Sequence, residues 1–169
     1  MRMIPLPSCK VLRSLLLYNK RTGVVTWKIL KGSRHPGTVV GCPDPRGYYR
    51  VRLNGTFYYL HRVIWKLETS VDPGNTVDHK DLNKSNNRWR NLRLATSTQQ
   101  HMNRRLQSNN TNGVKGIRKE KRPCIRAWQV RIYVDGKEVT IGRFRTKREA
   151  VAARRRAEKK HYKQFRRVQ

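Results

Sequence analysis

Acidic residues are scarce in this chain. Its 169 residues include 40 lysines and arginines but only 10 aspartates and glutamates, which gives a formal net charge of +30 and a pI near 11.4. Self-repulsion on this scale opposes a compact state unless a polyanion supplies the countercharge. The imbalance therefore predicts nucleic acid as the partner of this protein.

Cysteines and long apolar runs are also few. Cys9, Cys42 and Cys124 lie far apart without CxxC spacing, so we expect no structural zinc site. An odd number of thiols favours reduced cysteines and a cytoplasmic location. No apolar run reaches the roughly 18 residues of a membrane-spanning helix, and the segment 15–17 is too short for a signal peptide, so we expect no membrane partner.

Helix and strand patterns alternate along the N-terminal half. Asn54-Gly55 is a strong two-residue turn signal between strands that have one apolar and one basic face. The expected elements are a short amphipathic helix at 9–18, a hairpin or strand at 18–29, a loop at 31–46 with at most a short strand at 38–40, a hairpin at 48–60 and a short helix at 61–67.

The clearest chemical signal is Asp78-His79, which precedes an asparagine-rich loop. A carboxylate beside an imidazole offers a hard oxygen ligand for a metal ion and a titratable base. We expect a strand pair at 77–79 and 92–95 and a helix from Ser97, which together form a ββα unit. Neighbouring strand residues point to opposite faces, so a local bend must bring ion and base onto one substrate.

The sequence VDHKDLNKSNNRWRNLRLAT at 77–96 resembles the HNH (His-Asn-His, ββα-metal) nucleases of the phage and intron homing-endonuclease type, over roughly residues 15–105. The resemblance implies that Asp78 is a metal ligand, His79 the general base, and Asn91 the asparagine that braces the ββα loop. His61, in a His-Arg pair upstream, matches a supporting position.

The second metal ligand is the point of departure from that family. Where the family usually has Asn or His, nine residues after Asn91, this chain has Gln100, whose side chain is one methylene longer. His101 and Asn103 are substitutes. Ser97 and Gln100 also fit a capping box, which gives Gln100 an equally good structural role. If none of these side chains reaches the ion, cleavage would be weak or absent.

A second module follows the polar linker. Strands are expected at 114–119, 126–134 and 137–144, with a turn at Asp135-Gly136. Thr146 and Glu149 form a capping box that opens a helix through about Tyr162. Three strands and a helix make a small α+β module.

This module resembles an AP2 (ethylene-response-factor-like) DNA-binding domain over roughly residues 110–168, in GVKGIR, WQVRI, GK, IGRF and the alanine-rich helix. The resemblance implies that the exposed sheet face lies in the DNA major groove. Alternation independently predicts that Gln129, Arg131 and Tyr133 point outward. The predicted DNA-binding residues are Lys115, Arg118, Gln129, Arg131, Tyr133 and Thr140, together with Arg104 and Arg105.

The predicted fold class is therefore α+β, with an HNH nuclease domain at 1–105, a linker at 106–112 and an AP2-like domain at 113–169. The favoured function is a metal-dependent endonuclease of the nicking or site-specific homing type that acts as a monomer on double-stranded DNA, in the host cytoplasm if a phage encodes it. Oxygen ligands favour Mg²⁺, with Mn²⁺ acceptable, and no small-molecule cofactor is expected. Two alternatives stay open: a non-catalytic DNA-binding protein with a degenerate site, and a basic RNA-binding protein.

Overall fold

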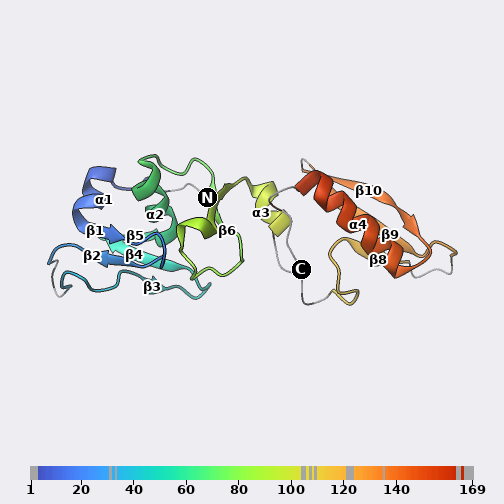
Figure 1. The fold of residues 1–169 in the computed structure, drawn as a ribbon, viewed down its shortest axis with the longest axis horizontal. Helices are drawn as coiled ribbons and strands as arrows, with labels where there is room; N and C mark the ends of the chain where they lie inside the picture. The colour runs from blue at the N-terminus through green and yellow to red at the C-terminus, as the bar shows by residue number, and fades with distance from the viewer. Residues whose placement is uncertain are drawn as a thin grey trace. The chain divides into compact units, whose positions relative to one another are not determined.

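Small sheets and short helices alternate along the chain in the computed structural model, as Figure 1 shows. The structure describes residues 4–30, 32, 34–103, 106, 108, 110–120, 124–134, 136–162 and 165, without the side chains of His101 and Asn103. The elements form two units, Met1–Thr96 (unit 1) and Ser97–Gln169 (unit 2). The mixture of small sheets and helices confirms the predicted α+β class.

The described residues of unit 1 form three small antiparallel sheets and two helices. Its elements are α1 (Cys9–Leu15), β1 (Leu16–Tyr18), β2 (Val25–Trp27), β3 (Cys42–Pro43), β4 (Tyr49–Leu53), β5 (Thr56–Tyr59), α2 (Leu60–Thr69), β6 (Thr76–His79), the 3-10 turn η1 (Trp89–Asn91) and β7 (Leu92–Ala95). The sheets pair β1 with β2, β3 with β4 and β5, and β6 with β7. The predicted hairpins and helices are confirmed, except that the first helix ends at Leu15 and residues 16–18 form strand β1 instead. Strand β3 lies in the stretch predicted as a loop.

Local turn chemistry explains the hairpin of β4 and β5. Asn54 and Gly55 have φ values of +47° and +80°, the left-handed pair that a two-residue hairpin turn requires. The resulting register places Val51 opposite Tyr58 and Leu53 opposite Thr56. Val51 and Leu53 are buried, at 3% and 1% exposure, so the predicted apolar face of this hairpin is confirmed.

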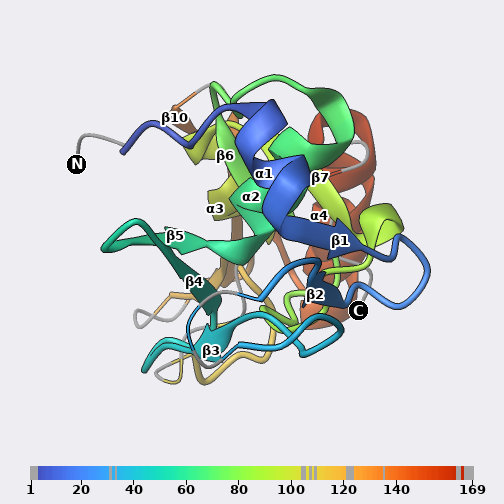
Figure 2. The same ribbon diagram turned by 90° about the vertical axis from the view of Figure 1, so that its left-hand side faces the viewer.

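One hydrophobic core holds unit 1 together and positions strand β6. Helices α1 and α2 pack side by side (Figure 2), and their residues Leu12, Val63 and Ile64 are fully buried. Val77 of β6 and Leu92 of β7 belong to the same core. Burying these apolar side chains, each worth about 1.5–3 kcal/mol, fixes which face of β6 turns inward.

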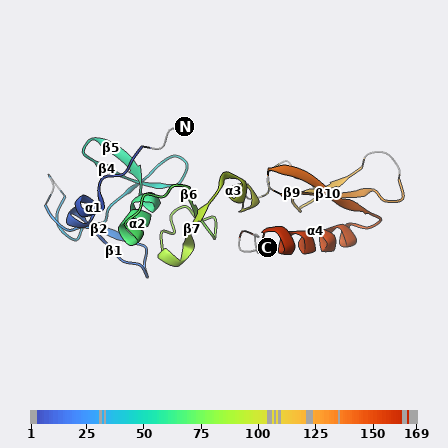
Figure 3. The ribbon, with the colours of Figure 1, turned by 90° about the horizontal axis from the view of Figure 1, so that it is seen from above.

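Unit 2 is a sheet covered on one face by a helix. It contains α3 (Ser97–Asn103), β8 (Ile117–Lys119), β9 (Trp128–Val134), β10 (Lys137–Phe144) and α4 (Lys147–Tyr162), with antiparallel strand order β10-β9-β8. Helix α4 lies along the sheet (Figure 3) and buries Ala150, Ala153 and Ala157 against it. The predicted three strands and helix are therefore confirmed.

The capping box of α4 is formed as predicted. The Glu149 carboxylate accepts hydrogen bonds from the backbone of Arg145 and Thr146, at 3.2 and 3.3 Å, and the Glu149 backbone donates to Thr146 Oγ1 at 3.2 Å. Strand β8 begins at Ile117 rather than Val114, because Gly116 has a φ of +71° and interrupts the extended backbone. Asp135 of the predicted turn lies outside the described residues.

Helix α3 belongs to unit 2, although the sequence pattern assigns it to the nuclease domain. Its Met102 packs against a cluster formed by Ile132, Ala157 and Tyr162. The helix begins at Ser97, as predicted, and the capping box of Ser97 with Gln100 stays a prediction. Of the helices in the described part of the chain, none is both long and apolar enough to cross a membrane.

Candidate active site

Strand β6 ends with Asp78 and His79, the pair that carried the sequence prediction. Antiparallel pairing with β7 places Asp78 opposite Arg93 and His79 opposite Leu92. The strand geometry turns consecutive side chains to opposite faces, as expected. His79 is buried, at 3% exposure, whereas Asp78 is half-buried beside Arg93.

The His79 imidazole lies in a cluster of rings. Its centroid is 5.2 Å from the ring of His61 at the start of α2 and 6.1 Å from that of Tyr48. His61 in turn stacks on Tyr59, with centroids 5.5 Å apart. The structure therefore brings His61 and His79 together, and it adds Tyr48, which the sequence pattern did not single out.

A hydrogen bond to the loop sets the tautomer of His79. His79 Nε2 lies 3.2 Å from Asn87 Oδ1, and Asn87 itself is buried, at 4% exposure. An amide oxygen only accepts hydrogen bonds, so in the neutral imidazole this contact places the hydrogen on Nε2 and the basic lone pair on Nδ1. Asn87 is thus a positioning residue for His79.

Burial keeps both imidazoles neutral. It lowers the pKa of His79 below 6.5, although the hydrogen bond with Asn87 and the charges of Asp78 and Asp81 act in the opposite direction. Burial, with the neighbouring His79 and Arg62, lowers the pKa of His61 to about 3. At neutral pH His79 is therefore unprotonated, the state that a general base needs.

Asn91 braces the loop between β6 and β7. Its Nδ2 donates to Asp81 Oδ1 and to the backbone oxygen of Asn86, at 2.9 and 2.8 Å, and its Oδ1 accepts from the Asp81 backbone at 3.1 Å. Asp81 also accepts from Asn83 and Asn86. These contacts give Asn91 the bracing position that the resemblance implied, within a fully hydrogen-bonded buried amide.

Asp78 forms an ion pair across the two strands. Arg93 Nε and Nη2 both donate to Asp78 Oδ2, at 3.1 and 2.9 Å, and the two side chains are 10% and 13% exposed. Arg93 was not predicted as a site residue. Only the strand register reveals this contact, because the two residues are fifteen positions apart in the sequence.

The donor set suits a hard divalent cation. Asp78 supplies a carboxylate, and no group of three or more His, Cys, Asp or Glu side chains in the described ranges could hold a metal ion by itself. Mg²⁺ does not need such a cage, since it keeps several waters and binds one or two carboxylates together with substrate phosphates. Asp78 therefore fits an ion that is held mainly by water and phosphate.

The candidates for a second metal ligand all lie on α3. Gln100 is half-buried there. The side chains of His101 and Asn103 lie outside the described part of the structure. Which of the three completes an ion's ligand shell stays a prediction.

A basic and aromatic face covers the β4–β5 hairpin of unit 1. The guanidinium groups of Arg50 and Arg52 lie 5.1 and 5.6 Å from the centroid of Phe57, which is 46% exposed. Cations that stack on an exposed aromatic ring are suited to contact with phosphates and bases. The predicted basic face of this hairpin is confirmed.

The outer sheet face of unit 2 holds the predicted DNA-binding residues. Arg118, Tyr133 and Thr140 are exposed there, and Lys115 is half-buried. Arg131 is bound to Glu138, with 3.0 Å between Nη1 and Oε2. Arg104 and Arg105 lie outside the described residues.

The expected exposure of Gln129 in unit 2 was wrong. Gln129 is only 7% exposed, because it lies on the central strand between Arg118 of β8 and Arg143 of β10, whose long side chains flank it. Arg154 of α4 is also buried, at 2% exposure, and donates to Glu158 at 2.8 Å and to the backbone oxygen of Arg131. It is a buried structural arginine.

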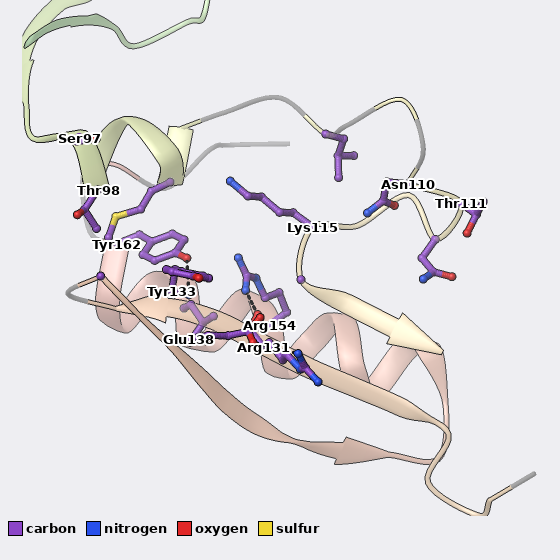
Figure 4. Close-up of a pocket in the computed structure, with 16 residues that line it drawn as sticks. Ser97, Thr98, Asn110, Thr111, Lys115, Arg131, Tyr133, Glu138, Arg154 and Tyr162 are labelled. Carbon is purple, nitrogen blue, oxygen red and sulfur yellow. Dashed lines mark hydrogen bonds and ion pairs between the residues drawn. The ribbon is translucent and has the colours of Figure 1, made fainter. Parts of the chain in front are cut away.

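A cavity of about 640 Å³ opens beside the sheet of unit 2 (Figure 4). Lys115, Arg131, Tyr133 and Tyr162 line it, and the Tyr162 hydroxyl accepts a hydrogen bond from the Tyr133 backbone at 3.2 Å. Every lining residue belongs to unit 2. Neither Asp78 nor His79 is among the residues that line the cavity.

A neutral buried imidazole next to a carboxylate, at the end of a braced strand pair, is an arrangement suited to general-base chemistry beside a bound cation. Residues 58–102 match the family model described as HNH endonuclease, in agreement with the resemblance that the sequence motif suggested for this segment. This segment includes Asp78, His79, Asn91 and Gln100.

Among solved structures, the chain is similar to the one described as "DNA binding and cleavage by the HNH homing endonuclease I-HmuI". The identity is 26%, the match covers 53% of this chain and 51% of that one, and the TM-score is 0.39. The match thus spans about half the length of I-HmuI. The comparison with curated proteins finds no significant match.

Proposed function

We propose that this protein is a divalent-metal-dependent endonuclease that nicks double-stranded DNA, with His79 as the general base and Asp78 as a metal ligand. The observation that carries the proposal is the buried His79 imidazole, neutral at physiological pH and next in sequence to Asp78. The match of residues 58–102 to the HNH endonuclease family supports it.

The base step follows from the His79 contacts. With hydrogen on Nε2 shared with Asn87 Oδ1, the imidazole accepts the proton of the attacking water at Nδ1. The water oxygen forms a bond to phosphorus while the bond to the 3′ oxygen breaks, and the leaving oxygen takes up a proton from solvent. His79 then returns its proton to water.

The other residues hold this base and the substrate in place. Asn91 and Asp81 fix the loop that carries Asn87, and His61 and Tyr48 pack the His79 ring. Asp78 would hold a divalent cation, Mg²⁺ or Mn²⁺, which supplies charge neutralisation at the scissile phosphate when bound. A second ligand from Gln100, His101 or Asn103 is part of the proposal.

DNA binding has two sources in the proposal. The net charge of +30 supplies non-specific attraction to phosphates. The outer sheet face of unit 2 supplies the base contacts, in the manner of an AP2-like domain, through Arg118, Tyr133 and Thr140. A single site cuts one strand per visit, so a monomer yields nicked circles.

A plasmid assay tests the proposal. Supercoiled DNA with Mg²⁺ should be nicked by the native chain, remain intact with EDTA, and remain intact with His79→Ala. His35→Ala is the matched control, because His35 is exposed in a loop of unit 1. Binding of duplex DNA without nicking under any divalent salt would point instead to a non-catalytic DNA-binding protein, and preferred binding of structured RNA to an RNA-binding protein.

A further inference from the structure

Arg93 binds one oxygen of the carboxylate that the proposed function assigns to the metal ion. The strand register makes Arg93 and Asp78 direct cross-strand neighbours, and both guanidinium donors reach Asp78 Oδ2, at 2.9 and 3.1 Å. The pairing of β6 with β7 thus holds a positive charge at the carboxylate. Water screens this charge poorly, because the Arg93 and Asp78 side chains are only 10% and 13% exposed.

The ion pair leaves Asp78 itself with little net charge to attract a cation. Asp78 and Arg93 together are neutral, and the nearby Asp81 carboxylate is engaged by Asn83, Asn86 and Asn91. A divalent ion at Asp78 therefore meets the repulsion of a guanidinium at close range. The phosphate of bound DNA would supply the missing negative charge, since Mg²⁺ sites commonly combine a carboxylate with substrate phosphates.

We propose that Arg93 couples metal binding to DNA binding. Its charge keeps the divalent ion weakly bound in the free protein, and the ion binds tightly only once a DNA phosphate is present. The inference rests on the proposed function for one point, that Asp78 is a metal ligand. Because such coupling is reciprocal, the ion strengthens DNA binding by the same factor.

The direction in which metal affinity changes when Arg93 is replaced distinguishes this role from simple positioning of Asp78. If Arg93 only oriented Asp78, its removal would weaken metal binding. If its charge opposes the ion, removing the charge strengthens metal binding by a factor in the range of about 5 to 150 that is typical of coupled sites. Arg93→Gln removes the charge, and Arg93→Lys keeps it while changing the geometry.

The first experiment measures Mn²⁺ affinity of the full chain without DNA by isothermal titration calorimetry. Arg93→Gln should bind Mn²⁺ at least about fivefold more tightly than the native chain, and Arg93→Lys should stay within about twofold of it. Weaker or unchanged binding by Arg93→Gln, or equal tightening by Arg93→Lys, overturns the inference. Thermal unfolding confirms that each variant is folded.

The second experiment uses the native chain, so it tests the coupling between metal and DNA binding even if the Arg93 variants do not fold. Mn²⁺ affinity is measured with a phosphorothioate duplex that carries a mapped nicking site, and the same titration of Asp78→Asn provides the DNA background. The duplex should raise the native affinity at least about fivefold. An unchanged affinity overturns the coupling, whereas Mn²⁺ binding that survives Asp78→Asn overturns the ligand assignment of the proposed function itself.

Discussion

Replacement of His61 by phenylalanine should remove much of the acid sensitivity of unit 1. His61 is 5% exposed and its pKa is about 3 in the folded protein, against 6.5 for an unperturbed histidine. Between these two values the unfolded chain binds a proton that the folded protein does not. Stability therefore falls as the pH falls from 6.5 towards 3, and it rises with pH across the same window.

The magnitude follows from the width of that window. Each pH unit below 6.5 lowers the free energy of unfolding by about 1.36 kcal/mol until the folded-state pKa is reached. At pH 5, His61 should therefore lower the free energy of unfolding by about 2 kcal/mol. Phenylalanine fills a similar volume beside Tyr59 and has no proton to bind. It also removes His61 Nδ1, a buried atom for which the described residues offer no hydrogen-bond partner.

Urea unfolding at pH 7.5 and pH 5 measures the effect by tryptophan fluorescence. Trp27, Trp65 and Trp89 report on unit 1, and a Trp128→Phe background removes the signal of unit 2. The stability difference between the two pH values should be smaller by about 2 kcal/mol in His61→Phe than in its parent. An equal acid loss in both, or a change of the same size in the exposed-site control His35→Phe, would refute the reasoning.

Three further substitutions test the loop, a close backbone contact and the sheet of unit 2. Asn91→Ala removes three buried side-chain hydrogen bonds and should destabilise unit 1 by about 3 kcal/mol, as measured by urea unfolding. Gly23→Ala should cost clearly more than the control Gly55→Ala, because both have positive φ but only a Cβ at Gly23 would come within 2.6 Å of the Arg88 backbone nitrogen. Arg118→Gln should make the plot of log DNA affinity against log salt concentration less steep by about one, the contribution of one phosphate contact. An unchanged slope would exclude Arg118 from the interface.

Local sequence signals were sufficient to predict most of the secondary structure. Asn54-Gly55 fixed one hairpin and Thr146 with Glu149 fixed the start of α4, because these residues contact only their own neighbours in the chain. Strand alternation predicted the outward face of Tyr133, and Val130 and Ile132 on the opposite face are buried. Such features need no knowledge of the tertiary fold.

Contacts between distant segments could not be predicted in this way. Tyr48 and His61 reach the His79 ring from other elements, and Arg93 reaches Asp78 only through the register of β6 and β7. Gln129 was assigned to an exposed face by alternation, yet flanking side chains bury it. Alternation predicts the face of a sheet, whereas exposure depends on the neighbouring strands.

The central claim is that the His79 imidazole accepts the proton of the attacking water. The most direct measurement is the single-turnover nicking rate of His79→Ala, at protein concentrations that saturate the DNA for both variant and native chain. The rate should fall by about 10² to 10⁴, the range typical of a lost general base, while the Kd for duplex DNA stays unchanged. Nicking at the native rate by His79→Ala would contradict the account.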